Sequence, residues 1–333
     1  VFAEGLIFIL LSFFGIREAI INSIPAGLKK AVAVGIGLFI TIIGLANAGI
    51  VSNDTGTLIG FVNFDMSHRT AIVAVIGLMI TIVLYIMKVP GSILISIAVT
   101  TLIGIPFGIT KVPENFSPIS IPAAPYLFCF EWKNILSLKF VIVLFTFLFT
   151  DLFDTLGTLM GIAEQGNLKD EKGNIRNAKG ALLSDALGTV AGACLGTSTV
   201  TSFVESTSGV AVGARTGLAS VGTAFLFLIA LFFTPLFALV PAAATAPALI
   251  FVGFMMMKSI TAIDFSDATE GIPAFVTIMV MPFSYSISKG IAWGIISYAL
   301  CKLVGKKAKD VNIVTWILAA VFIFDIVFEA YTK

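Results

Sequence analysis

The stretch TFLFTDLFDTLGTLMG, residues 146 to 161, decides the fold class because it places two carboxylates in an otherwise apolar segment. An ionised carboxylate in hydrocarbon costs at least about 2.5 kcal/mol on the most lenient scale, so Asp151 and Asp154 require a protein-lined or watery surrounding. At 3.6 residues per turn, Thr150, Asp154 and Thr158 fall on one helix face, and Asp151 and Thr155 lie beside them. We therefore expect a membrane helix with one polar stripe turned toward a cavity inside the protein.

The composition of the whole chain predicts a polytopic, all-α membrane protein. The 333 residues are 58% hydrophobic and 12% charged, whereas a soluble domain is about 45–50% apolar and about 25% charged. Apolar runs of about 20 residues recur, and each is about long enough to cross a bilayer core. The net charge of +1 gives no reason to expect nucleic acid as a partner. We expect a multi-pass protein of the plasma (inner) membrane.

The apolar runs predict the positions of the membrane helices. They cover residues 1–16, 31–51, 70–87, 90–110, 138–162, 179–196, 203–214, 216–240, 242–258, 272–287, 288–303 and 311–330. Pro282 and the following SYSISKG are expected to separate the segments 272–287 and 288–303. Segments 179–196 and 203–214 are short and rich in Gly, Ala, Ser and Thr, which is typical of interrupted helices.

Basic residues predict which helix ends face the cytoplasm. One basic cluster contains Arg17, Lys29 and Lys30. The stretch REAIINSIPAGLKKAV that carries this cluster is amphipathic, and we interpret it as an interfacial connector. The single histidine, His68, lies in a polar loop, and the three cysteines are far apart. These spacings predict no metal site and no cofactor.

A second polar stretch, GTSTVTSFVESTSGVAVGARTG at residues 196–217, predicts an extended segment followed by a short helix that starts near Phe203. Extended backbone at membrane depth is tolerated only where protein or a cavity supplies hydrogen-bond partners. Interrupted helices of this kind form binding sites in secondary transporters. Glu205 at the helix start would accept two parallel hydrogen bonds from a ligand with adjacent N–H and NH₂ donors. The alternative is that Glu205 only caps the helix.

The other acidic residues have structural alternatives as well. Asp154 and Asp151 would cap a helix or bond a neighbouring helix if they are not functional. Asp185, in ALLSDALGTVAGA, is a third intramembrane acid that would orient helices or stabilise a broken-helix crossing. A desolvated acid also suits a proton-coupled carrier, because such a group binds and releases a proton near neutral pH.

Four long motifs give the chain a family resemblance. TFLFTDLFDTLGTLMG, LLSDALGTVAGACLGTSTVTSFVESTSGVAVGARTGL, TAPALIFVGFMM and IPAFVTIMVMPFSYSISKGIAWG resemble the AzgA-like purine permeases. These proteins are the hypoxanthine/adenine/guanine branch of the nucleobase–ascorbate transporter superfamily, also described as nucleobase:cation symporter-2 type. The resemblance extends over essentially all 333 residues, including EGLIFILLSFFGIREAIINSIP near the start.

The resemblance implies an inverted-repeat fold of seven plus seven spans, with a core and a gate domain. The third and tenth spans would each be a short strand plus a half-helix, and Val1 would fall at the start of the fourth span, so that the N-terminal part is missing. The implied domains are core 1–16, gate 17–110, extracellular loop 111–137, core 138–240, gate 241–303 and a tail, 304–333, with an extra hydrophobic helix.

The resemblance also implies site residues. The eighth-span acid falls on Asp154 and the tenth-span acid on Glu205. The implied substrate-binding set is Glu205, Asp154, Phe203, Val204 and Ser202. Asp154 and Asp151 are implied for proton coupling, and Asp185, Thr199 and Thr158 are implied as structural polar residues.

The function that follows is import of purine nucleobases (hypoxanthine, guanine, adenine) by proton symport. The alternatives are an uncoupled nucleobase facilitator and a uracil/xanthine permease of the same fold. An enzyme is not expected, because the polar residues contain no nucleophile–base pair, metal cluster or nucleotide loop. The expected partners are the purine base, the proton and the lipid bilayer, and gate helices rich in small residues permit a homodimer.

Overall fold

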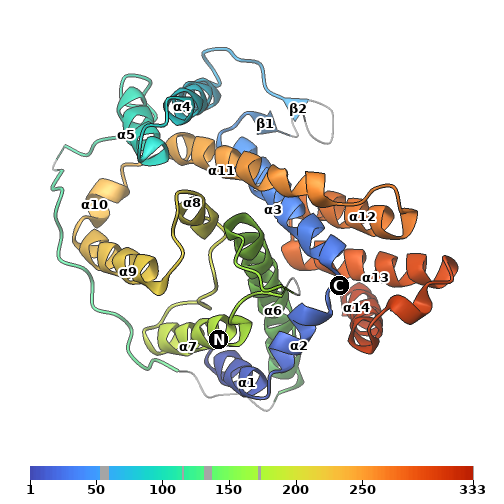
Figure 1. The fold of residues 1–333 in the computed structure, drawn as a ribbon. Coiled ribbons are helices and arrows are strands. Elements are labelled where there is room, and N and C mark those ends of the chain that lie inside the picture. The colour runs from blue at the N-terminus through green and yellow to red at the C-terminus, as the bar shows by residue number, and fades with distance from the viewer. Residues whose placement is uncertain (53–59, 115, 131–136, 172–173, 333) are drawn as a thin grey trace. The chain divides into compact units, whose positions relative to one another are not determined.

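The computed structural model describes residues 1–52, 60–114, 116–130, 137–171 and 174–332 and is predominantly helical (Figure 1). The helices are α1 (Phe2–Phe13), α2 (Ile16–Ser23), α3 (Ala26–Asn47), α4 (Arg69–Ile86), α5 (Ser92–Ile103), α6 (Leu138–Gly166), α7 (Ala178–Cys194), α8 (Ser206–Ala211), α9 (Gly217–Phe232), α10 (Thr234–Phe237), α11 (Ala242–Met256), α12 (Ala268–Ser284), α13 (Ile287–Val304) and α14 (Ile313–Thr332). Two 3₁₀ turns, η1 (Met257–Ala262) and η2 (Ala308–Asp310), and the antiparallel strands β1 (Val51–Ser52) and β2 (Gly60–Phe61) complete the elements.

Each predicted apolar segment contains a helix. Five helical stretches of the described residues are long and apolar enough to cross a membrane: Ala26–Asn47, Arg69–Ile86, Val143–Gly166, Ala242–Ala262 and Ile287–Val304. The shorter apolar helices include α1, α5, α9 and α12. The chain is therefore an all-α, integral, multi-pass membrane protein.

Two local predictions need correction. The break between the segments 272–287 and 288–303 lies within the predicted SYSISKG stretch, but not at Pro282, which is inside α12. Instead, Tyr285 adopts a left-handed conformation with φ of 55° and ends α12. Ser286 then caps α13 by accepting a hydrogen bond from Lys289 N. The short helix α8 also begins three residues later than expected, at Ser206, because residues 197–203 have no regular secondary structure.

The described residues form two compact units. The first contains residues 1–36, 124–213 and 256–333, and the second contains residues 37–123 and 214–255. The division into core and gate domains remains a prediction.

In the first unit, α1 lies beside α7 (Figure 1). The two helices approach closely at Gly5, where a Cβ atom would come within 2.7 Å of Val190 Cγ2. Helices α12 and α13 form a tight hairpin, in which Gly294 leaves room for Thr277. Small residues allow such close approach because they place little or no side chain between the two backbones. The hydrophobic core of this unit includes Phe8, Phe153, Leu156, Leu182 and Phe322.

In the second unit, α4 and α5 form a hairpin that is joined by buried hydroxyl groups. Thr81 Oγ1 donates to Ser96 Oγ at 2.7 Å, and Ser96 Oγ donates to the carbonyl of Gly77 at 2.9 Å. A separate apolar cluster packs the end of α3 and the strand β1 against the starts of α4 and α11. By contrast, α9 has no buried side chain, and Phe225 and Phe227 are both exposed.

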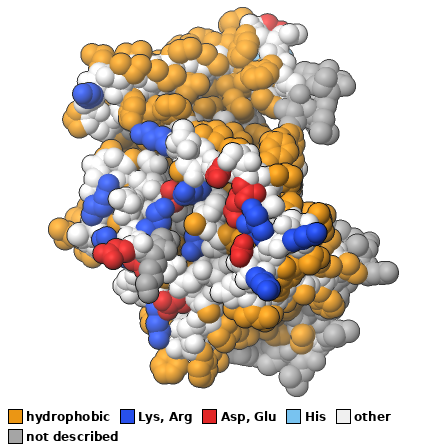
Figure 2. All heavy atoms as spheres, turned by 45° about the vertical axis from the view of Figure 1, so that its right-hand side comes forward, with side chains coloured by type: hydrophobic (Ala, Val, Ile, Leu, Met, Phe, Trp, Pro, Cys, Tyr) orange, Lys and Arg blue, Asp and Glu red, His pale blue; other side chains and the backbone are white. Residues whose placement is uncertain are grey.

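The outer surface is largely apolar. Figure 2 shows one face, on which the Lys, Arg, Asp and Glu side chains gather together and broad areas around them are hydrophobic. Two ion pairs of the first unit are at the surface or close to it, Lys307 with Asp267 and Lys302 with Glu270, each with an N···O distance of 2.6 Å. An apolar outer surface is what a protein in lipid requires, because hydrocarbon offers polar groups no hydrogen bonds.

Candidate polar site in the first unit

The centre of the candidate site is a buried ion pair between α2 and α7. The guanidinium of Arg17 donates from Nη2 to Asp185 Oδ2 at 3.0 Å, and the two side chains are 0% and 1% exposed. Arg17 Nη1 also donates to the carbonyl of Leu182 at 2.9 Å, and the guanidinium lies over the Phe8 ring, 4.2 Å from its centroid. The charge of Arg17 is therefore inside the protein, whereas the interpretation of its stretch as an interfacial connector remains a prediction.

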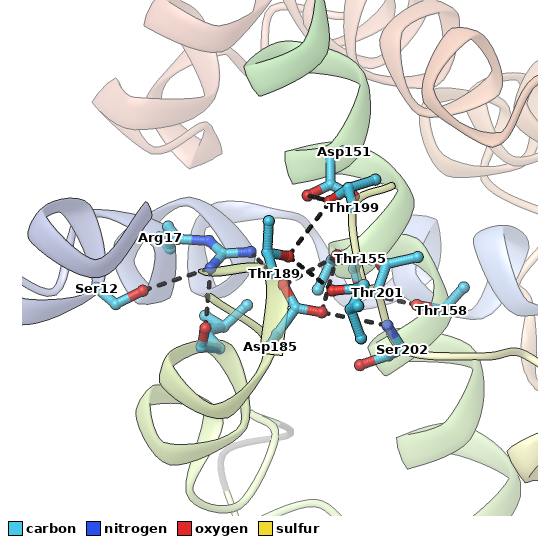
Figure 3. A network of polar contacts seen from close by, with 12 residues as sticks. Ser12, Arg17, Asp151, Thr155, Thr158, Asp185, Thr189, Thr199, Thr201 and Ser202 are labelled. Atoms are coloured by element: carbon cyan, nitrogen blue, oxygen red, sulfur yellow. Dashed lines mark hydrogen bonds and ion pairs between the residues drawn. The ribbon is translucent and has the colours of Figure 1, made fainter. Parts of the chain in front are cut away.

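Asp185 connects this ion pair to α6 and to the extended segment 197–203 (Figure 3). Thr155 Oγ1 lies 3.3 Å from both carboxylate oxygens of Asp185 and 2.6 Å from Thr201 Oγ1. The backbone N–H of Ser202 donates to Asp185 Oδ1 at 3.2 Å. A backbone amide that would be unpaired in an extended segment thus finds its partner in an intramembrane carboxylate.

Asp151, one helical turn from Thr155 on α6, contacts the same extended segment. Thr199 Oγ1 donates to Asp151 Oδ2 at 3.3 Å. Thr189 of α7 donates to the carbonyl of Val200 at 2.8 Å, and its hydroxyl lies 3.3 Å from Thr199 Oγ1. Asp151 is buried, with 6% exposure. Because these contacts come from both α6 and α7, the two helices together fix the path of the extended segment.

The polar stripe of α6 faces this network with part of the expected residues. Asp151, Thr155 and Thr158 are buried, whereas Thr150 is exposed and Asp154 is only half-buried. Thr158 donates only to the carbonyl of Thr155 in its own helix, at 3.0 Å. The predicted stripe therefore faces inward at Asp151, Thr155 and Thr158, whereas Thr150 and Asp154 lie at its more exposed edge.

Asp154 faces another helix. Its carboxylate lies near the backbone of Ser288, in the first turn of α13. A carboxylate in this place stabilises a helix, because free N–H groups and the positive end of the helix dipole point toward it. Contact with a neighbouring helix is the structural alternative that the sequence left open for Asp154. A role of Asp154 in binding or coupling remains a prediction.

Glu205 is the N-cap residue of α8, but its side chain forms no capping hydrogen bond and is exposed. The structure thus contradicts the alternative in which Glu205 only caps the helix. Phe203 is 64% exposed and Val204 is buried at 8%. Of the predicted binding residues, Ser202 alone is joined to the network, through its backbone N–H. The structure does not bring Glu205 and Asp154 into contact.

A cavity of ≈ 380 Å³ lies elsewhere in this unit, and it is mainly apolar. Its lining includes Phe2, Phe130, Phe140, Phe147 and Thr197. None of the predicted binding residues lines it, so we do not assign the substrate to this cavity.

Sequence analysis missed two residues of this region, Arg17 as a member of the network and Glu4. Glu4 is 0% exposed and neither of its carboxylate oxygens has a hydrogen-bond partner. The signal was available, because Glu4 is an acid within the apolar run VFAEGLIFILLSFFGI. Among the described residues, no group of three His, Cys, Asp or Glu side chains is placed to hold a metal ion.

Comparison with known proteins identifies the family. The model of the Permease family matches residues 1–293. The chain is 42% identical over 331 residues to the guanine/hypoxanthine permease PbuG of Bacillus subtilis (98% of this chain, 74% of the relative). It is 38% identical over 326 residues to the adenine permease AdeQ of Escherichia coli (96% and 71%). It is 37% identical over 334 residues to the guanine/hypoxanthine permease PbuO of Bacillus subtilis (98% and 76%).

These matches cover most of the chain, including the whole polar network and all predicted site residues. They agree with a membrane architecture of apolar helices around buried acids. The chain therefore belongs to the Permease family, and it is a transport protein rather than an enzyme.

Proposed function

We propose that this protein imports purine nucleobases by proton symport across the plasma (inner) membrane. The observation that carries the proposal is the similarity, over 96–98% of the chain, to permeases named for guanine/hypoxanthine and for adenine. The inverted repeat of seven plus seven spans, the core and gate domains and a homodimer belong to the same proposal.

Glu205 is the proposed recognition residue for the base. Its carboxylate is exposed and does not cap α8, so both oxygens are free to accept N–H donors from a heterocycle. A carboxylate forms charge-assisted hydrogen bonds with paired donors, which are about twice as strong as neutral ones. Ser202, Phe203 and Val204 precede Glu205 on the segment that Asp185 and Thr155 hold, and we propose that they line the same site.

Intramembrane acids support proton coupling. Asp151 and Asp154 lie on one helix of the first unit, and the segment that carries Glu205 is bonded to Asp151 through Thr199. An acid that takes up a proton on one side of the membrane and releases it on the other links the proton gradient to the substrate. We propose Asp154 and Asp151 as groups that change protonation during transport.

The test is uptake of labelled hypoxanthine in cells that lack their own purine carriers. Unlabelled adenine, guanine, xanthine and uracil compete in turn, with and without a protonophore. Uptake that adenine and guanine block, that uracil blocks poorly and that the protonophore abolishes is the expected result. Uptake that the protonophore leaves unchanged would favour an uncoupled facilitator. Preferential block by xanthine or uracil would favour a uracil/xanthine permease of the same fold. Absence of uptake for every purine would overturn the proposal.

A further inference from the structure

Glu4 is a fully buried carboxylate of the first unit that the proposed function does not use. It lies on α1 with Phe8 and Ser12 one and two turns away, and all three side chains are buried, at 0%, 0% and 2% exposure. This face of α1 packs against α7, where a Cβ atom on Gly5 would meet Val190 and Thr189. Glu4 is thus enclosed by protein on the side where the polar network begins.

The Glu4 carboxylate lacks the donors that an ionised form requires. Neither Oε1 nor Oε2 has a hydrogen-bond partner. A buried charge without hydrogen bonds is strongly disfavoured, and such a group becomes neutral instead. The surroundings of Glu4 in this structure therefore suit the carboxylic acid rather than the carboxylate.

The charges that face Glu4 lead to the same conclusion. They are the carboxylates of Asp151 on α6 and Asp185 on α7 and the guanidinium of Arg17 on α2. The guanidinium is already committed to Asp185 and to the carbonyl of Leu182. A third negative charge beside two carboxylates would be opposed by like-charge repulsion, so a proton on Glu4 relieves the cluster.

Arg17 carries the complementary unpaired group. Its Nε, which is a donor, has no hydrogen-bond partner although the side chain is fully buried. An orphan donor and two orphan acceptor oxygens therefore occur within one electrostatic cluster. A buried polar atom without a hydrogen bond is destabilising, so an arrangement that joins this donor to these acceptors would be favoured.

We propose that Glu4 holds a coupled proton, and that its deprotonation draws the Arg17 guanidinium away from Asp185 toward Glu4. The Glu4 carboxylate takes this proton from water on one side of the membrane, forming an O–H bond, and returns it to water on the other side. The inference rests on the proposed proton coupling and adds a proton-holding residue to the acids of α6.

The proposal gives the proton a physical route to the substrate segment. When Arg17 leaves Asp185, the carboxylate of Asp185 keeps Thr155 and the N–H of Ser202 as its partners. Asp185 then loses its positive counter-charge and the segment 197–203 loses the anchor that α2 provides through the ion pair. A chain of contacts through Arg17 and Asp185 thus links the protonation of Glu4 to the position of the segment before Glu205.

The test compares Glu4→Gln with Glu4→Asp, and with Glu114→Gln as a matched control in which the same change is made at an exposed position of the second unit. Gln imitates the neutral acid and keeps its shape. We expect Glu4→Gln to exchange labelled hypoxanthine for unlabelled hypoxanthine across the membrane, but to lose protonophore-sensitive accumulation. Glu4→Asp should retain part of the accumulation, and Glu114→Gln should behave as wild type.

Two further measurements separate coupling from a purely structural role. For each proton that is bound together with the purine, the dissociation constant should rise about tenfold per pH unit above the pKa of the site, and Glu4→Gln should flatten this dependence. Infrared difference spectroscopy of the purified protein should show the C=O band of a protonated carboxylic acid that is absent from Glu4→Gln.

The outcomes distinguish this inference from the proposed function. A wild-type protein that accumulates no purine, or does so regardless of the protonophore, would overturn the proposed coupling itself. A coupled wild type with equally coupled Glu4→Gln, or a carboxylic-acid band that persists in that variant, would overturn the role of Glu4 alone. If Glu4→Gln fails to reach the membrane, Glu4→Asp decides the question: its carboxylic-acid band should lie at a different frequency from the wild-type band at matched pH, and a band shared unchanged by both proteins contradicts the assignment.

Discussion

The Arg17 guanidinium donates to Asp185 at 3.0 Å across 168 positions of sequence, and both side chains are buried almost completely. The pair joins α2 to α7, and Asp185 in turn holds Thr155 and the backbone of Ser202. One ion pair thus connects two helices to the segment that precedes Glu205. Burying two charges is costly unless their remaining hydrogen-bonding groups are satisfied, and here most of them are.

Removal of one member of this pair should destabilise the protein strongly. Asp185→Asn leaves the Arg17 charge buried without its counter-ion, and we expect a loss of about 3–5 kcal/mol in the free energy of unfolding. Arg17→Met should cost a similar amount. Thermal unfolding in detergent measures the effect. The double variant should lose less stability than the two single variants together, because it leaves no buried charge without a counter-ion.

The control for this prediction is the ion pair of Lys307 with Asp267, which is exposed. Lys307→Met should change stability little, because water screens an exposed pair and long side chains lose entropy when they are held. Equal losses from the buried and the exposed pair would contradict the importance that we assign to burial.

The hydroxyl of Thr155 should position the extended segment. Thr155→Val keeps the shape of the side chain but removes contacts to Asp185 and Thr201, and we expect a loss of about 1–3 kcal/mol in stability. It should also raise the KM for hypoxanthine uptake several-fold, because the segment before Glu205 loses an anchor. Thr155→Ser should restore both quantities.

Thr158→Val is the matched control for Thr155→Val. Both residues are buried on α6, but the hydroxyl of Thr158 donates only within its own helix. Its loss should leave the KM unchanged. A KM that rises equally in both variants would show that any change on this face of α6 disturbs transport.

Glycine packing between α12 and α13 should be essential for stability. A Cβ atom at Gly294 would overlap the Thr277 hydroxyl, so Gly294→Ala forces the hairpin apart and should cost about 1–3 kcal/mol. Gly222→Ala is the control, because nothing lies within 4 Å of the added Cβ at this α9 position. That variant should be neutral or gain up to about 1 kcal/mol, since Ala favours the helix. Unfolding midpoints of the two proteins decide the prediction.

Asp267 should make stability depend on pH at the start of α12. Its bonds to Lys307 and to the backbone N–H of Thr269 lower the pKa of its carboxyl below the ordinary value. A lowered pKa contributes stability that is present above the unfolded pKa of about 3.9 and is lost as the pH falls through the folded pKa. Asp267→Asn should therefore be slightly less stable than wild type at pH 7, because water screens much of the ion pair with Lys307.

The difference between these two proteins should narrow in acid, because protonation removes the charge of Asp267 that Asn also lacks. Asn retains the helix cap, so Asp267→Ala should be less stable than Asp267→Asn at every pH. Unfolding temperatures measured from neutral pH downward test both statements. If the difference in unfolding temperature between wild type and Asp267→Asn stays constant as the pH falls, the ion pair is excluded as the cause of that difference.

Glu205→Gln and Asp154→Asn should separate binding from coupling. We expect Glu205→Gln to weaken hypoxanthine binding at least about tenfold, because charged acceptors form the stronger hydrogen bonds. Asp154→Asn should retain binding and lose proton-coupled accumulation. Direct binding to purified protein and uptake with a protonophore measure the two effects. Normal uptake by Asp154→Asn with an unchanged pH profile would exclude its coupling role.

The positions of the helices could be predicted because they depend on local properties. Each apolar run contains a helix, and the Ser/Thr-rich stretch before Phe203 has no regular secondary structure, as its β-branched and small polar residues indicate. The exact breaks were less predictable. Tyr285, rather than Pro282, ends α12, because a single left-handed residue and a Ser cap stop a helix as effectively as proline does.

The partners of the buried acids could not be predicted. Helical periodicity places Asp151 and Asp154 near each other, but it does not say which neighbouring helix each one meets. In the structure Asp151 meets the extended segment, and Asp154 meets the start of α13. Arg17 was expected at the membrane interface, because a basic residue in an amphipathic stretch usually lies there.

The sequence by itself thus determined the membrane class, the helices, the interrupted segment and the set of acids that hydrocarbon would not tolerate. These properties follow from hydrophobicity and backbone preference, which act over a few residues. Only the tertiary structure decided that Arg17 neutralises Asp185, that Asp151 and Thr155 rather than Asp154 hold the segment, and that Glu4 lies beside them without a donor. Those pairings depend on how distant helices pack, because a buried charge takes the partner that the fold brings within hydrogen-bond distance.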